Sequence, residues 1–146
     1  MPALLQFEKY LDKIIGEIQS FPSDDSIWQV PPGIANSAGN LGLHIAGNLL
    51  HFIGAVMGNT GYVRTREREF NDKGLTCAEV VQQLMRAKET VQQVLGASDR
   101  LSGTDDYPEL FQGNRVSVNE VLAHLLAHLA YHTGQINYLR RLQYPA

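Results

Sequence analysis

All five histidines of this 146-residue chain lie in its two most hydrophobic segments. His124, His128 and His132 stand four residues apart in one segment, and His44 and His51 belong to the other. Uncharged imidazole is a common ligand of zinc and other first-row metals, and histidines at positions i and i+4 of one helix can bind the same ion. The alternative is that they are hydrogen-bonded core residues without a metal, so the direction in which each one points is the first question.

The later histidine segment predicts a helix, over about residues 117–142, that turns two of its three histidines toward a core. With about 100° per residue, one apolar stripe on this helix contains Val118, Val121, Leu125, Leu129, Ile136 and Leu139. His132 lies about 20° and His128 about 60° from the centre of this stripe, whereas His124 lies about 100° away. We therefore expect His128 and His132 to face the core and His124 to lie at its margin.

The earlier histidine segment predicts a second helix, over about residues 37–57, with a polar flank beside its apolar stripe. The stripe contains Leu41, Ile45, Leu49, Phe52 and Val56. On the flank, the side chains of His44, Asn48 and His51 lie about 60–120° to one side of Ile45. If the histidine-bearing flanks of the two helices face each other, they form a polar cleft. A third imidazole would complete a three-histidine set there, and three protein ligands leave an open position at a zinc site of the catalytic type.

Two further helices are expected, over about residues 2–19 and 76–96, because apolar residues recur there with the helical period. Capping boxes are predicted at Thr76 and Ser117, each followed by a glutamate three residues later. The sequence contains no strand-rich region and no domain linker. We therefore expect one domain over residues 1–146 with an all-α fold, a four-helix bundle with long connections at 59–75 and 98–116. A short hairpin is possible in the second connection, and connections of this length permit crossovers.

Composition narrows the possible classes of function. The net charge of −3 provides no basic face for a nucleic acid. Cys77 is the single cysteine, which excludes an intrachain disulfide, and we expect its thiol to be unreactive at the start of its helix.

The apolar stretch at residues 41–57 is interrupted by glycine, asparagine and histidine, which makes it too short and too polar for a membrane span. Because the N-terminus also lacks a signal-peptide pattern, a cytoplasmic location is expected.

Acidic residues near the predicted cleft are scarce, and the basic residues form one cluster. Arg64, Arg66 and Arg68 are interrupted by Glu67 and Glu69, so this segment is expected to be a mixed-charge, solvated loop. The alternative is that these arginines steer an anionic substrate. A hydrolase would need a carboxylate as its base, and the candidates are loop residues such as Asp105 or Asp106.

Three segments carry a resemblance to a known family. They are SAGNLGLHIAGNLLHFI at residues 37–53, TREREFNDKGLT at 65–76 and HLLAHLAYHTGQINYLRRL at 124–142. The most specific is the last, in which two histidines four residues apart precede TGQI and a basic end. With these segments the chain resembles the DinB-like (DinB/YfiT) superfamily of four-helix metal-binding proteins over nearly its whole length. The REREF-type segment resembles the uncharacterised DUF1572-like branch.

The resemblance implies a metal site and a set of activities. By position, His44, His128 and His132 match the ligands of a divalent ion, described in that superfamily as zinc or nickel. The superfamily includes S-transferases that use a low-molecular-weight thiol and act on small molecules, and homodimers are expected. A metal-bound thiol is held as the reactive thiolate because a cation lowers its pKa. Hydrolysis through metal-bound water is the alternative.

The remaining polar residues are assigned supporting roles. Asn48, His51 and Gln135 are expected to line the cleft or to hydrogen bond the ligands, since ligating imidazoles usually donate their second N–H to an oxygen. Two other interpretations of the whole protein stay open. One is a non-catalytic module that binds a metal or small ligand, and the other is a structural role for the histidines without any metal.

Overall fold

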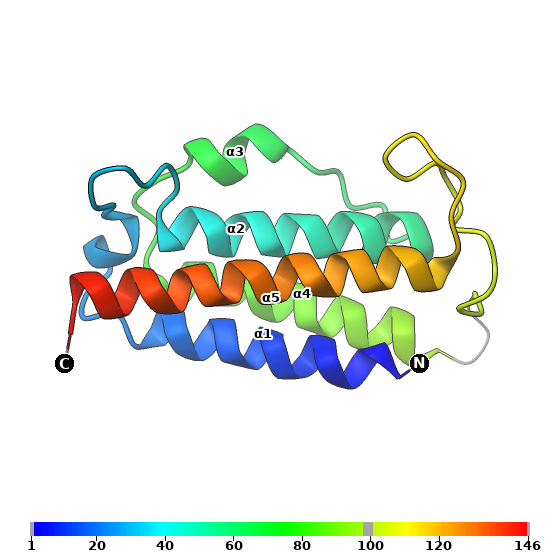
Figure 1. The fold of residues 1–146 in the computed structure, drawn as a ribbon, viewed down its shortest axis with the longest axis horizontal. Coiled ribbons are helices and arrows are strands. Elements are labelled where there is room, and N and C mark those ends of the chain that lie inside the picture. The colour runs from blue at the N-terminus through cyan, green and yellow to red at the C-terminus, as the bar shows by residue number, and fades with distance from the viewer. Residues whose placement is uncertain (1, 98–100, 146) are drawn as a thin grey trace.

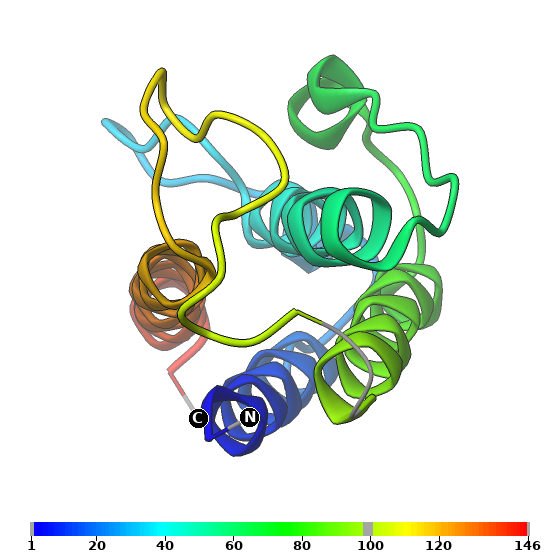
Figure 2. The ribbon, with the colours of Figure 1, turned by 90° about the vertical axis from the view of Figure 1, so that its right-hand side faces the viewer.

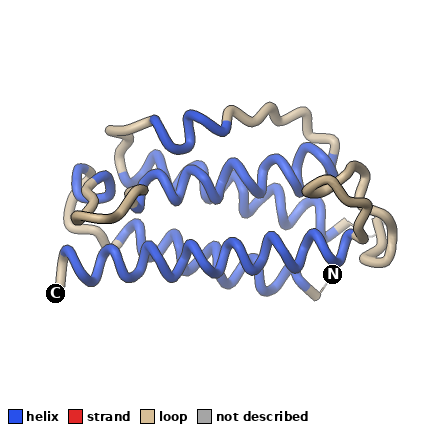
Figure 3. Tube along the Cα trace, turned by 45° about the horizontal axis from the view of Figure 1, so that its top comes forward, coloured by secondary structure: helices blue, strands red, loops and turns tan. Residues whose placement is uncertain are grey.

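The computed structural model describes residues 2–97 and 101–145, and these residues form helices joined by loops, without any strand among them (Figure 3). The long helices are α1 (Ala3–Gln19), α2 (Ala38–Leu49) with its π-helical continuation η2 (Leu50–Met57), α4 (Cys77–Gly96) and α5 (Val118–Gln143). The short ones are the 3-10 helix η1 (Asp25–Trp28) and α3 (Arg66–Asn71). The all-α prediction is confirmed, and each expected helix is present to within about two residues.

The long helices are arranged around a shared core, which Figure 2 shows end-on. Both α1 and α2 pack against α4 and α5. The connection from η2 to α4 runs back along the outside of α2 and carries α3 with it (Figure 1). As a result α2 and α4 point in the same direction, while α1 and α5 point the other way. The order is therefore not simply up and down, because one crossover separates α2 from α4.

Local sequence signals determine where the helices begin. The side chains of Ser37, Thr76 and Ser117 each accept a hydrogen bond from the backbone N–H three residues later, which satisfies a donor that the helix itself leaves unpaired. At Ser117 the capping box is complete, since Glu120 accepts from the Ser117 backbone N–H at 2.7 Å. The predicted apolar stripe of α5 is buried throughout.

The π-helical segment changes which residues of the second helix are buried. Phe52 and Val56 were expected in the core, but they are half-buried, and Ile53 and Met57 take their places. A π turn closes with i→i+5 bonds and so adds a residue to the helical turn. The residues beyond Leu50 are consequently rotated relative to a regular α-helix, which moves the buried face one position along the chain.

The connection over 59–75 is only in part the solvated loop that the charges around Arg64–Arg68 predicted, since Arg66, Glu67 and Arg68 are exposed whereas Arg64 is half-buried and Glu69 is buried. Its central part forms α3, which is attached to the start of α2 by the fully buried Asn40. The Asn40 amide donates hydrogen bonds of 2.9 Å to the backbone oxygens of both Glu69 and Asp72. Trp28 donates from its indole nitrogen to the backbone oxygen of Leu75 at 2.9 Å. These contacts hold α3 and the segment that follows it against the start of α2 and against η1.

The second long connection contains short antiparallel pairings instead of strands. Isolated bridges join Phe111 with Asn114 and Asp106 with Ser117. The hairpin that the sequence permitted is thus present only as these bridges over the described part of the connection, and residues 98–100 lie outside the described residues.

The apolar second helix has the length and composition of a membrane span, contrary to the estimate from its sequence. Over Ala38–Met57 the mean hydropathy reaches 1.2, but most of this segment is buried inside the protein. Its apolar character is therefore accounted for by packing against the other long helices, as for the central helix of a globular core.

Candidate metal centre

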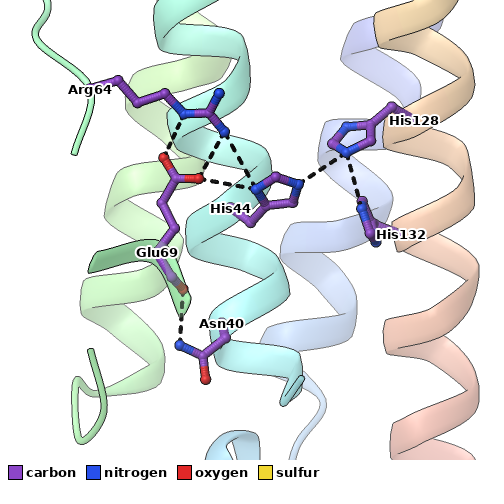
Figure 4. Close-up of polar contacts among 6 residues, drawn as sticks. All are labelled: Asn40, His44, Arg64, Glu69, His128 and His132. Carbon is purple, nitrogen blue, oxygen red and sulfur yellow. Dashed lines mark hydrogen bonds and ion pairs between the residues drawn. The ribbon is translucent and has the colours of Figure 1, made fainter. Parts of the chain in front are cut away.

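Three of the five histidines meet between α2 and α5, as Figure 4 shows. The Nε2 atom of His128 lies 3.0 Å from Nε2 of His44 and 3.1 Å from Nε2 of His132. One nitrogen from each ring lies within 4.8 Å of the others, and His44 is buried while the other two are half-buried. The structure thus brings together the three residues that the helical angles and the resemblance selected.

Two of these imidazoles have oxygen partners on their outer side. His44 Nδ1 lies 3.0 Å from Glu69 Oε1, and His132 Nδ1 lies 2.7 Å from Gln135 Oε1. A carboxylate or an amide oxygen accepts hydrogen bonds, so each Nδ1 carries the proton. The lone pairs on Nε2 of His44 and His132 then point toward His128. This is the tautomer that a metal ligand bound through Nε2 requires.

Glu69 is the residue at this centre that sequence reasoning missed. It is 6% exposed, and Arg64 holds it with two hydrogen bonds of 2.8 Å, from Nε to Oε2 and from a terminal nitrogen to Oε1. Burial by itself raises the pKa of this carboxyl group, but the hydrogen bonds from His44 and Arg64 outweigh it and lower the pKa. Glu69 therefore remains ionised and ties Arg64 to His44 (Figure 4).

Gly47 was the sequence signal that could have located Glu69. A Cβ atom at Gly47 would overlap the Glu69 carboxylate, so the glycine leaves the space that this carboxylate occupies against α2. The other acidic candidates are elsewhere. Asp106 pairs with Arg115, and the Asp105 side chain accepts from the backbone N–H of Ser102.

The other two histidines do not join the cluster. His124 is exposed, with its ring 5.0 Å from that of Phe111. His51 lies in the π-helical segment and is half-buried beside Phe52. The rotation introduced by the π turn removes His51 from the polar flank on which it was expected. Asn48, by contrast, is buried on that flank and lines a cleft together with His44 and His128.

Two clefts reach the histidine cluster. The first, of about 320 Å³, has His44, His128 and Asn48 in its wall, with Phe52 and Phe111 as apolar neighbours. The second, of about 640 Å³, has His132 and Gln135 in its wall and is otherwise mostly apolar, with residues 31–36 on one side. The cluster is thus shielded from bulk solvent but accessible to small molecules.

Burial holds the imidazoles in their uncharged form. The pKa of His128 falls to about 4, chiefly because burial disfavours its charged form and further because His132 and His44 lie close to it. Burial also lowers the pKa of His132, although the hydrogen bond with Gln135 acts in the opposite direction. Neutral imidazoles are the form that binds a metal.

The Cys77 thiol is not activated as a nucleophile, because burial and Asp24 raise its pKa.

We expect the metal-free protein to lose stability as the pH falls from about 6.5 to about 4. The pKa of His128 drops from its ordinary value of 6.5 to about 4 on folding, so between these values the unfolded chain binds a proton that the folded chain does not. This contribution is fully present above pH 6.5 and is lost toward pH 4. Urea unfolding at several pH values measures it. His128→Leu should reduce the slope of stability against pH, and an unchanged slope would contradict the assignment.

Comparison with known proteins identifies a family but no activity. The model of a family described as "Protein of unknown function (DUF1572)" matches residues 3–144. No curated protein matches the chain.

Proposed function

We propose, for a chain that belongs to the DUF1572 family of proteins of unknown function, that it binds one divalent metal ion, zinc or nickel, through His44, His128 and His132. The convergence of three Nε2 atoms carries this proposal. With protons fixed on the Nδ1 atoms of His44 and His132, two lone pairs point at the third ring. One proton on His128 can serve only one of them, whereas a cation attracts all three.

The same residues support an enzyme with an open metal position. When bound, the cation would supply positive charge that lowers the pKa of a thiol or of water. Both oxygens of Glu69 are already engaged by Arg64 and His44, so this carboxylate is not free to act as a base. No other carboxylate among the described residues lines the cleft beside His44 and His128. We therefore favour an S-transferase reaction over hydrolysis. In that reaction the thiolate of a low-molecular-weight thiol attacks an electrophilic small molecule, which needs no carboxylate base.

The domain, the fold type, the location and the oligomeric state are proposed from the resemblance to the DinB-like superfamily. We infer a single DinB-like domain over residues 1–146, a four-helix bundle of the DinB/YfiT type, that acts on small molecules in the cytoplasm. The crossover order of the helices and the position of the histidines on α2 and α5 support it. A homodimer is also proposed. Its support is the apolar surface of α5, where Tyr131, Tyr138 and Leu142 are 65%, 64% and 74% exposed.

Metal content and thiol binding test this proposal together. Protein purified without a histidine tag should contain about one zinc or nickel ion per chain by elemental mass spectrometry. After exchange to cobalt(II), addition of glutathione, bacillithiol or mycothiol should produce a sulfur-to-metal charge-transfer band if a thiolate occupies the open position. Metal-free protein with the same thiol is the control.

The outcomes separate the remaining alternatives. Metal uptake without a charge-transfer band or turnover would favour a non-catalytic module that binds a metal or small ligand. Absence of uptake, with an unchanged melting temperature on addition of zinc or nickel, would overturn the metal site, since a ligand that binds only the folded state must raise its stability.

A further inference from the structure

Two polar atoms are buried at the centre without a hydrogen-bond partner, Nδ1 of His128 and Oδ1 of Asn48. Both side chains contribute to the wall of the same cleft. Asn48 lies one turn beyond His44 on α2, and it is 7% exposed, so its oxygen is not satisfied by bulk water. Buried polar groups are nearly always paired, and two such exceptions in one place require an explanation.

The protonation of His128 supplies that explanation. In the metal-free cluster, His128 can carry its proton on Nε2 and donate it to His44 or His132, which lie 3.0 and 3.1 Å away. Ligation through Nε2 requires the lone pair at that atom, so the proton must then be on Nδ1. Metal binding therefore converts His128 Nδ1 into a buried donor, which needs an acceptor.

We propose that Asn48 is the positioning residue for His128, with its Oδ1 atom accepting a hydrogen bond from His128 Nδ1 when the metal is bound. This inference rests on the proposed metal site. Arg64 and Arg66, in the wall of the same cleft, carry only donors and cannot serve. With Asn48 each of the three imidazoles has a side-chain oxygen behind it, as His44 has Glu69 and His132 has Gln135. The fixed tautomer and ring orientation then strengthen metal binding.

An amide suits this position better than an apolar side chain of equal size. Its oxygen can accept from the protonated Nδ1 of the loaded form, whereas no hydrogen bond joins Asn48 to the Nδ1 atom of His128 in the metal-free structure. An aspartate at residue 48 would match only the loaded form. Asn48→Leu keeps the branched shape of the side chain and removes both hydrogen-bonding functions, which makes it the informative variant.

The test compares zinc affinity and the His128 N–H signal in wild type, Asn48→Leu and Asn48→Asp. We expect Asn48→Leu to weaken zinc binding by about 10–100-fold, as loss of such outer partners typically does, and Asn48→Asp to restore it. In zinc-loaded protein with ¹⁵N-labelled histidine, the Nδ1 proton of His128 should be a slowly exchanging downfield resonance that Asn48→Leu removes. His51→Ala, on the same helix but outside the cluster, is the matched control and should change neither readout.

Two results would overturn the inference in different ways. If wild type and Asn48→Leu bind zinc equally and show the same His128 Nδ1 resonance, the metal site stands but Asn48 does not position His128. If wild type takes up no zinc, the proposed metal site fails and this inference fails with it. A loss of affinity that Asn48→Asp does not restore would assign Asn48 a packing role only, and would also contradict the proposal.

Discussion

Replacing His128 with alanine is expected to lower the affinity for zinc or nickel by more than about 100-fold, because it removes the central member of the three-histidine set. Its Nε2 atom is the one that lies 3.0 and 3.1 Å from the other two. The helices should remain folded, since a half-buried imidazole with a lowered pKa contributes little to the apolar core. His44→Ala and His132→Ala should behave in the same way.

The matched control for this prediction is His124→Ala. His124 lies one turn before His128 on α5, but it is exposed and contacts Phe111 instead of the cluster. Competition titration against a chelator gives the affinity, and circular dichroism reports on the helices. Full metal content in His128→Ala, or an equal loss in His124→Ala, would show that the ion is bound elsewhere.

Replacing Glu69 with alanine is expected to destabilise the protein by about 3–5 kcal/mol, the usual cost of removing one partner from a buried ion pair. Arg64 would keep its charge with its side chain only 12% exposed and without a counter-ion. His44 would lose the acceptor at its Nδ1 atom, so metal affinity should also fall by about 10–100-fold. Urea unfolding and chelator competition measure the two effects separately.

Two further variants isolate the cause of this effect. Glu67→Ala, an exposed acid on the same short helix, should change stability by less than about 0.5 kcal/mol. The double variant Arg64→Met with Glu69→Leu should be more stable than Glu69→Ala, since no uncompensated charge then remains buried. Equal stability of Glu69→Ala and Glu67→Ala would mean that the ion pair does not hold α3 in place.

The helices and the inward-facing histidines were predictable because their causes are local. Capping residues such as Ser37 and Ser117 satisfy donors within one turn, and a period of 3.6 residues assigns each side chain to a face. His128 and His132 are on the same helix as their apolar stripe, so their direction follows from counting residues. The same count correctly left His124 outside the cluster.

The same count failed where the backbone departs from the regular α-helix. The π turn beyond Leu50 moved Phe52 and Val56 out of the core and His51 away from the cluster, and nothing in the local residue types distinguishes this segment from an α-helix. This segment packs against α4, and packing between helices that are distant in the sequence is a tertiary property.

By itself the sequence determined an all-α chain, the boundaries of its long helices and the inward direction of His128 and His132, because periodicity and capping act between neighbours in the chain. Only the tertiary structure decided that Glu69, from a segment with the charge pattern of a solvated loop, lies behind His44. That contact requires α3 to fold back over α2, the absence of a side chain at Gly47, and the hydrogen bonds of Asn40. These residues are far apart in sequence, and their meeting depends on packing that no local pattern records.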